Sequence, residues 1–208
     1  LAVHDLIKEY MTKHQRIIFN GNGYSDEWVA EAERRGLPNI KSMIEAVDTL
    51  TTEKSVNLFE KFGIFTKTEL ESRAEVLYET YAKTINIEAL TMIDMASKQY
   101  VPAIVKYTKS LADTVVAVKD AGADAQVQTE ILKAVNGKLG EVKSALAKLE
   151  EAEAKAAAMD NVKDQAFFYK DVVKTAMDEL RAPVDEVEMM VDKKAWPVPS
   201  YADLMFEV

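Results

Sequence analysis

The chain has 208 residues, with 26 Lys and Arg against 35 Asp and Glu, and its formal net charge is -9. An acidic balance with no evident basic patch argues against a general nucleic-acid binder. Cysteine is absent, which excludes disulfide scaffolds, thiolate zinc sites and cysteine nucleophiles.

No stretch approaches the roughly 20 apolar residues that a membrane helix needs, and the start of the chain has no signal-peptide pattern. We therefore expect a cytoplasmic protein with no membrane partner. The sequence begins at Leu1, inside an apparent helix and without an initiator Met, so we also expect it to be a piece of something longer.

Seven Gly and five Pro in the whole chain are few, and they cluster at a few places, so long helices should dominate. We expect a mainly α fold: a long-helix bundle with an antiparallel, coiled-coil-like arm. Short extended segments are expected near 17–19 and in the C-terminal tail.

The first elements carry clear start and stop signals. Apolar residues at helical spacing predict a helix over 3–16, followed by an extended run at 17–19 and a turn at 20–23. Ser25 should then cap a helix with an acidic first turn, which stops at Gly36.

A short helix that begins at Ser42 or Lys41 should run through Leu50, and the next, opened by Thr51–Glu53, should end with Lys61 and Phe62. The longest apolar stripe in the sequence follows, from Thr66 or Thr68 to Val118. If continuous, this helix would be about 80 Å long. Pro102 cannot donate a helical hydrogen bond, so a kink or offset is expected there.

An antiparallel arm should follow a hairpin at Gly122. Its seam residues step by three and four, a period of 3.5 that is typical of coiled coils: Leu132, Val135, Leu139, Val142, Leu146 and Leu149. A return segment capped by Asp160 and Asn161 continues the stripe, and Pro183 should bend or restart it. Segments 84–120, 124–158 and 161–191 thus predict an up-down-up bundle.

The search for a chemical site finds little. The loop Gly21–Gly23 lacks the Lys-Ser/Thr pair of a nucleotide-binding loop, so a plain turn is the better interpretation than an anion site. His4 and His14 lie about 15 Å apart along one helix, too far to share a metal. We therefore assign no catalytic, cofactor-binding or metal-binding residue.

Six residues are candidates for structural or interface roles instead. Asn86 and Glu88 are polar positions on an otherwise apolar helix, which suggests an internal hydrogen-bond network or a subunit contact. The aromatic pair Phe167 and Phe168 is too large for a two-helix seam and should pack on a third helix or a neighbouring subunit. Trp28 and Trp196 complete the set; Trp196 opens an apolar tail expected to dock.

Several strings resemble the C-terminal region of type III glutamine synthetases, the large bacterial form of that enzyme, and the resemblance runs nearly end to end. The strings that carry it are Arg16–Trp28, Gly36–Asn39, Phe62–Leu70, Lys83–Met95, Tyr100–Ile104 and the tail from Trp196 to Val208. The tail segment Tyr201–Phe206 also resembles the terminal strand of ordinary glutamine synthetases. The arm, about 120–190, matches by pattern more than by residue identity.

The resemblance implies a parent that joins ammonia to glutamate with ATP and Mg or Mn, in nitrogen metabolism. The family's catalytic motifs lie before this region, so no catalytic residue carries over and the chain alone should be inactive. The family forms large rings, which implies a homo-oligomer and the rest of the catalytic domain as partners.

We accordingly divide the chain into 1–66, which closes the parent's catalytic domain, 67–195, the bundle and arm, and 196–208, a docking tail. The leading hypothesis is a non-catalytic structural and assembly region of a glutamine synthetase ligase. The alternative is a free-standing helical adaptor that binds a partner helix through the arm. A module that senses a nucleotide or metabolite at residues 20–23 is a third hypothesis.

Overall fold

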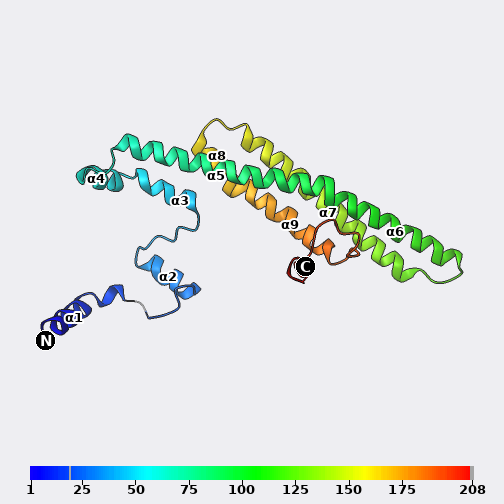
Figure 1. Cartoon of the computed structure of the whole chain (residues 1–208), viewed down its shortest axis with the longest axis horizontal. Helices are drawn as coiled ribbons and strands as arrows, with labels where there is room; N and C mark the ends of the chain where they lie inside the picture. The colour runs from blue at the N-terminus through cyan, green and yellow to red at the C-terminus, as the bar shows by residue number, and fades with distance from the viewer. Residues whose placement is uncertain (19, 207–208) are drawn as a thin grey trace. The chain divides into compact units, whose positions relative to one another are not determined.

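The computed structural model describes residues 1–18 and 20–206. The chain divides into two compact units, Leu1–Ala46 and Val47–Val208, and Figure 1 labels the helices α1 to α9. The described residues are mainly helical, as the sequence predicts. These two units reflect which residues contact one another. The functional boundaries expected at 66 and 195 stay a prediction.

The N-terminal unit contains α1 (Ala2–Lys13), the 3₁₀-helix η1 (Gln15–Ile17) and α2 (Asp26–Arg34), and α3 (Met43–Val47) begins in it. The extended run expected at 17–19 is wrong for Ile17, which is helical; Ile18 alone is extended, and Phe19 lies outside the described residues. A 3₁₀ turn satisfies the amides of Ile17 and Ile18 on the carbonyls of His14 and Gln15.

The predicted start and end signals of α2 are both confirmed. The Ser25 hydroxyl accepts a hydrogen bond from the Trp28 amide, and Gly36 has a φ of 73°. With Gly36 in the left-handed region, the Leu37 amide reaches back to the Ala32 carbonyl at 2.9 Å, which ends the helix.

The second unit starts with η2 (Asp48–Thr51) and α4 (Glu53–Lys61), and then enters a long rod made of α5 (Lys67–Met95), η3 (Ala96–Tyr100) and α6 (Val101–Asp120). Thr66 caps the rod: its hydroxyl accepts from the Glu69 amide while the Glu69 side chain accepts from the Thr66 amide. Of the two starts that the sequence allows, Thr66 and Thr68, the structure has the first.

The offset expected at Pro102 takes the form of a π-helical turn, η3, directly before it. In this turn the Val101 amide donates to the Ala96 carbonyl, five residues back. The wider turn accommodates one extra residue and relieves the crowding that a proline ring imposes on the preceding turn of an α-helix.

The chain then turns at Gly122 and runs back as α7 (Gln126–Ala157); a second turn leads to α8 (Val162–Phe168), the π-helical η4 (Tyr169–Val173) and α9 (Lys174–Glu188). Helix α7 packs against α6 and α9, and α8 packs against α5 (Figure 1). The expected up-down-up bundle is therefore present. Its first helical pass begins earlier than residue 84, because α5 starts at Lys67. Helix α9 continues through Pro183, so the expected restart there is wrong.

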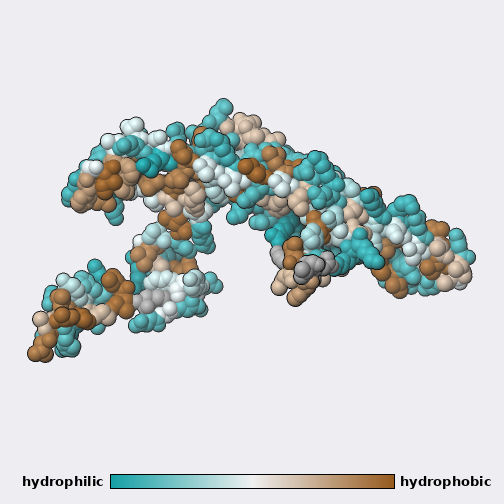
Figure 2. Space-filling view, viewed as in Figure 1, coloured by the Kyte–Doolittle hydropathy of each residue, from teal (hydrophilic) through white to brown (hydrophobic). Residues whose placement is uncertain are grey.

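The core of this unit lies where its long helices pack against one another. Fully buried side chains come from all three passes: Leu70, Ile104, Val135, Val142, Leu146, Leu149, Tyr169, Val173, Leu180 and Val187. Figure 2 shows hydrophilic residues over much of the visible bundle surface, with hydrophobic residues in small groups. Within the described part of the chain, no helix is long and apolar enough to cross a bilayer.

The tail differs from expectation. Residues Tyr201–Phe206 form a short helix, α10, and not an extended segment or strand. The reason is a Ser-x-x-Asp cap: the Asp203 amide donates to the Ser200 hydroxyl, and the Ser200 amide donates to the Asp203 carboxylate.

Candidate functional site

Asp48, Tyr78 and Lys163 form a polar contact that joins η2, α5 and α8. The Tyr78 hydroxyl donates to the Asp48 carboxylate, and Lys163 Nζ lies 2.7 Å from the same oxygen. Only 5% of Tyr78 is exposed. A single carboxylate oxygen therefore connects three elements that are distant in sequence.

The electrostatics of this contact are consistent with a charged Asp48. Burial works to raise the pKa of the Asp48 carboxyl, but hydrogen bonds from Lys163 and Tyr78 outweigh it, and the pKa lies below its usual value. Burial, and then the hydrogen bond to Asp48, raise the pKa of Tyr78. The pair thus holds its proton on the phenol and its negative charge on the carboxylate.

Phe167 extends this contact as an aromatic layer. Its ring lies 6.4 Å from that of Tyr78, and Lys163 and Lys170 each lie 5.8 Å from its centre. Phe168 is half-buried. For Phe167, the expected packing on a third helix is therefore a contact with α5, which carries Tyr78.

Asn86 faces the core and Glu88 does not. The Asn86 Oδ1 and the Tyr169 hydroxyl are both buried, and neither has a hydrogen-bond partner among the described residues. Burial, followed by the charge of Glu153, raises the pKa of Tyr169, while the nearby Asn86 side chain acts in the opposite direction. Glu88 is exposed, so the structure does not bring the two predicted polar residues together.

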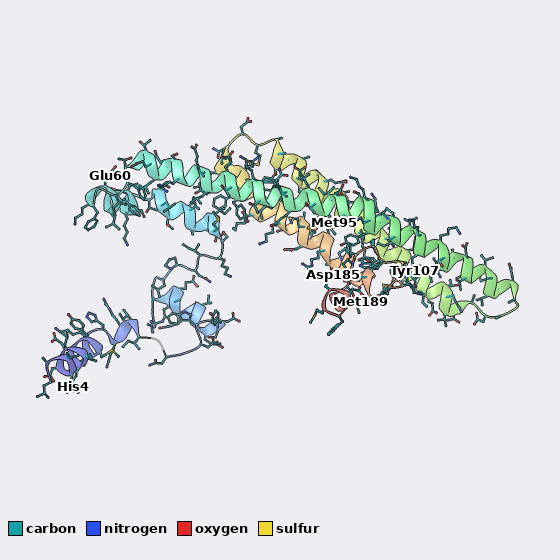
Figure 3. The ribbon with its side chains drawn as sticks, viewed as in Figure 1. His4, Glu60, Met95, Tyr107, Asp185 and Met189 are labelled. Carbon is teal, nitrogen blue, oxygen red and sulfur yellow. The ribbon has the colours of Figure 1, made fainter. Side chains whose placement is uncertain are left out.

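Trp196 stacks on Tyr100 of the π-helical turn, with ring centres 5.2 Å apart and planes inclined by 23°. Tyr100 also lines a cavity of about 270 Å³ between the rod and α9. Figure 3 labels Met95 and Asp185, which line this cavity from the two facing elements. The lining is mostly apolar: Met92, Met95, Ala96, Tyr100, Leu180 and Val184, with Arg181 and Asp185.

Trp28, the remaining candidate, belongs to the N-terminal unit. It is half-buried, and the Arg35 guanidinium lies 5.7 Å from its ring centre. That contact is local to α2 and its C-terminal cap.

Sequence reasoning missed Asp48, Tyr78, Lys163 and the partner role of Tyr100. The apolar stripe expected from Thr66 or Thr68 to Val118 includes Leu77 and Tyr81 at helical spacing; these two are half-buried, whereas Tyr78 and Ala82 are buried. A wider apolar face for α5, which a helix with two neighbours requires, would have included Tyr78.

The donor groups of the described residues do not fit a divalent metal. No set of three or more His, Asp or Glu side chains converges among them. Many carboxylates instead pair with a Lys or Arg one helical turn away, as Glu151 does with Lys155 at 2.7 Å. No chemical step through a metal is therefore assigned to this chain.

Comparison with known proteins identifies the region. The family described as the glutamine synthetase C-terminal domain matches residues 2–119, more than half of the chain. The chain belongs to this family. As part of a glutamine synthetase, it corresponds to the C-terminal region, as the resemblance of its sequence predicts.

Curated relatives match nearly the whole chain. A glutamine synthetase of Butyrivibrio fibrisolvens is 38% identical over 208 residues, covering 99% of the chain and 30% of the relative. A type-3 glutamine synthetase of Dictyostelium discoideum is 34% identical, and a glutamine synthetase of Bacteroides fragilis is 31% identical; each covers 99% of the chain and 29% of the relative. The chain spans about 30% of the length of the curated relatives it matches.

Proposed function

We propose that this glutamine synthetase C-terminal region is a non-catalytic scaffold that closes the parent's catalytic domain and contributes to subunit packing. The supporting observation is the length of the match: 99% of the chain aligns with only 30% of a relative named glutamine synthetase. The ligation of glutamate and ammonia, with ATP and Mg or Mn, is then the work of the parent's other residues.

The contacts of the second unit support a structural role. Side chains of η2, α5 and α8 meet at one carboxylate, and apolar residues from three passes of the chain fill the core. Within this proposal residues 1–66 face the catalytic domain, 67–195 form the bundle and 196–208 form a docking tail. A homo-oligomeric ring and a cytoplasmic location are part of the proposal and rest on the family.

The test compares the 208-residue chain with its full-length parent. Glutamine formation from glutamate, ammonia and ATP is measured with Mg or Mn, and assembly is measured by light scattering. The isolated chain should show no turnover, and the parent should be active.

A second experiment weakens the bundle within the full-length parent. Replacing Val142 and Leu146, both fully buried, with Ala should reduce assembly and activity together. A parent that assembles and turns over normally with an unfolded bundle would refute the scaffold role, and turnover by the isolated chain would refute the non-catalytic one.

A further inference from the structure

Residues 192–206, called here the tail loop, begin with a turn built on Asp192. The Ala195 and Trp196 amides donate to the Asp192 carbonyl at 2.8 and 3.1 Å, and the Lys194 amide donates to its side chain at 2.7 Å. Asp192 therefore fixes the direction in which the loop leaves the bundle.

The tail loop closes on itself. Lys193, near its start, forms an ion pair with Asp203, whose side chain is 14% exposed. The amide and hydroxyl of Ser200 both donate to the same carboxylate at 2.7 Å. Pro197 and Pro199 restrict the backbone between these points. The ion pair and the Ser200 hydrogen bonds join residues within the loop.

The attachment to the bundle is narrower. Trp196 stacks on Tyr100, and each of these two rings lines a separate cavity. Tyr100 lines the cavity of about 270 Å³, and Trp196 lines another of about 460 Å³ with Met189 and Val191. Beyond the loop closure, Leu204, Met205 and Phe206 are 70–77% exposed, so α10 adds little apolar contact.

The closed position also carries a cost. The Trp196 Nε1 is buried and has no hydrogen-bond acceptor among the described residues. Water satisfies this donor once the indole leaves Tyr100, and an unsatisfied buried N–H is unfavourable. Cavities beside the pair also mean that fewer atomic contacts are lost on separation.

We propose that the tail loop is a preformed strap that opens as one body about the Asp192 turn. Opening separates Trp196 from Tyr100 and exposes the π-helical turn. The Lys193–Asp203 closure stays intact during this motion. This conformational device goes beyond the proposed scaffold function and does not depend on it.

The experiment uses the 208-residue chain with Trp28→Phe, which leaves Trp196 as the sole tryptophan. Trp196 fluorescence and its quenching by acrylamide report the stack, and hydrogen exchange at the Leu204 amide reports the loop. Leu204 is informative because its amide donates to the Ser200 carbonyl at 3.1 Å.

Two substitutions separate the stack from the closure. Tyr100→Ala should shift Trp196 emission to the red and increase quenching, with Leu204 exchange unchanged. Asp203→Ala should accelerate Leu204 exchange and leave Trp196 emission unchanged. Tyr100→Phe, which keeps the ring, is the matched control and should behave as the parent chain.

Contrary results are equally clear. Accelerated Leu204 exchange in Tyr100→Ala, with the bundle still folded by circular dichroism, would show that the tail unravels from its end and would overturn the strap. Unchanged Trp196 emission in that variant would also overturn it. If Tyr100→Ala unfolds the rod, Trp196→Ala removes the same stack from the loop side; fast Leu204 exchange in that variant would overturn the proposal.

Discussion

The two units of the chain use amphipathic helices differently. Helices α1 and α2 of the N-terminal unit contain no buried residue, and Leu6 of α1 is 49% exposed. Helix α7 of the second unit buries Val135, Val142 and Leu146 completely. Both stripes have helical periodicity, so periodicity predicts a helix but does not tell whether the same chain covers its apolar face.

The difference has an energetic meaning. Apolar side chains stabilise a fold in proportion to the area that they remove from water, about 25 cal/mol per Å². The second unit gains this contribution from its own helices, whereas α1 gains little within the chain. Substitutions in the two units should therefore have very different effects on stability.

The largest expected effect is in the α7 seam. Leu146→Ala removes a fully buried side chain and should lower the free energy of unfolding by about 2–5 kcal/mol. Leu6→Ala in α1 is the matched control and should change it by less than about 0.5 kcal/mol. Urea unfolding followed by circular dichroism measures both, and equal effects would remove the contrast between the units.

A second substitution tests the polar junction. Tyr78→Phe deletes the hydrogen bond to charged Asp48 and should lower the free energy of unfolding by about 1.5 kcal/mol. This value is at the low end for hydrogen bonds to charged groups, because the Asp48 side chain is 40% exposed. Tyr24→Phe, at a residue that is 99% exposed, is the control. Thermal unfolding compares them, and an unaffected Tyr78→Phe chain would show that the junction does not stabilise the bundle.

The same junction predicts a pH dependence at alkaline pH. The pKa of Tyr78 is raised in the folded chain, so the folded state keeps its proton where the unfolded state loses it. Stability should therefore fall as pH rises above about 10, the ordinary tyrosine pKa. Tyr78→Phe should flatten this fall in denaturant titrations, and an unchanged slope would contradict the assignment.

Asp48 should make stability fall toward acid pH, whereas Tyr78 makes it fall toward alkaline pH. Its folded pKa is lowered, so its contribution is present above about 3.9, the ordinary Asp value, and is lost as pH falls through the folded pKa. Asp48→Asn should weaken the acid dependence of stability, as measured by unfolding between neutral and acid pH.

Helix caps offer a more local comparison. Thr66→Ala removes the capping box of α5 and should cost the second unit about 1 kcal/mol. Ser25→Ala removes the cap of α2 and should lower the helix content of that unit without shifting the main unfolding transition. A shift of that transition by Ser25→Ala would mean that the two units unfold together.

The smallest effect is expected at Tyr169. Its hydroxyl is buried without a partner among the described residues, so Tyr169→Phe should be close to neutral or slightly stabilising. The contrast with Tyr78→Phe separates a satisfied hydroxyl from an unsatisfied one. A loss in chemical denaturation equal to that of Tyr78→Phe would imply a hydrogen bond at Tyr169.

Local signals in the sequence predicted most of the helices. Ser25, Thr66, Gly122 and Asn161 are caps or turns whose side-chain or backbone chemistry acts over three or four residues. Such effects need no knowledge of the rest of the molecule. The start of α10 was also local: Ser200 and Asp203 carry a cap signal that the resemblance to a strand obscured.

The interface residues were less accessible to sequence reasoning. The contact of Asp48 with Tyr78 and Lys163 spans distant parts of the chain, and charged residues on helix surfaces carry no mark of their partner. Tyr100 presented another difficulty, because a π-helical turn changes the phase of the stripe just before Pro102. Only the packing of the helices determines which side chains meet.

The π-helical turn at Ala96–Tyr100 has a consequence for the evolution of chain length in this family. Each residue of an α-helix rotates the chain by about 100°, so one deletion within α6 would turn its later residues away from α7. A deletion inside η3 would convert the turn to ordinary α-helix and preserve the facing of α6. Variants that are one residue shorter and keep this bundle should therefore have lost that residue within η3.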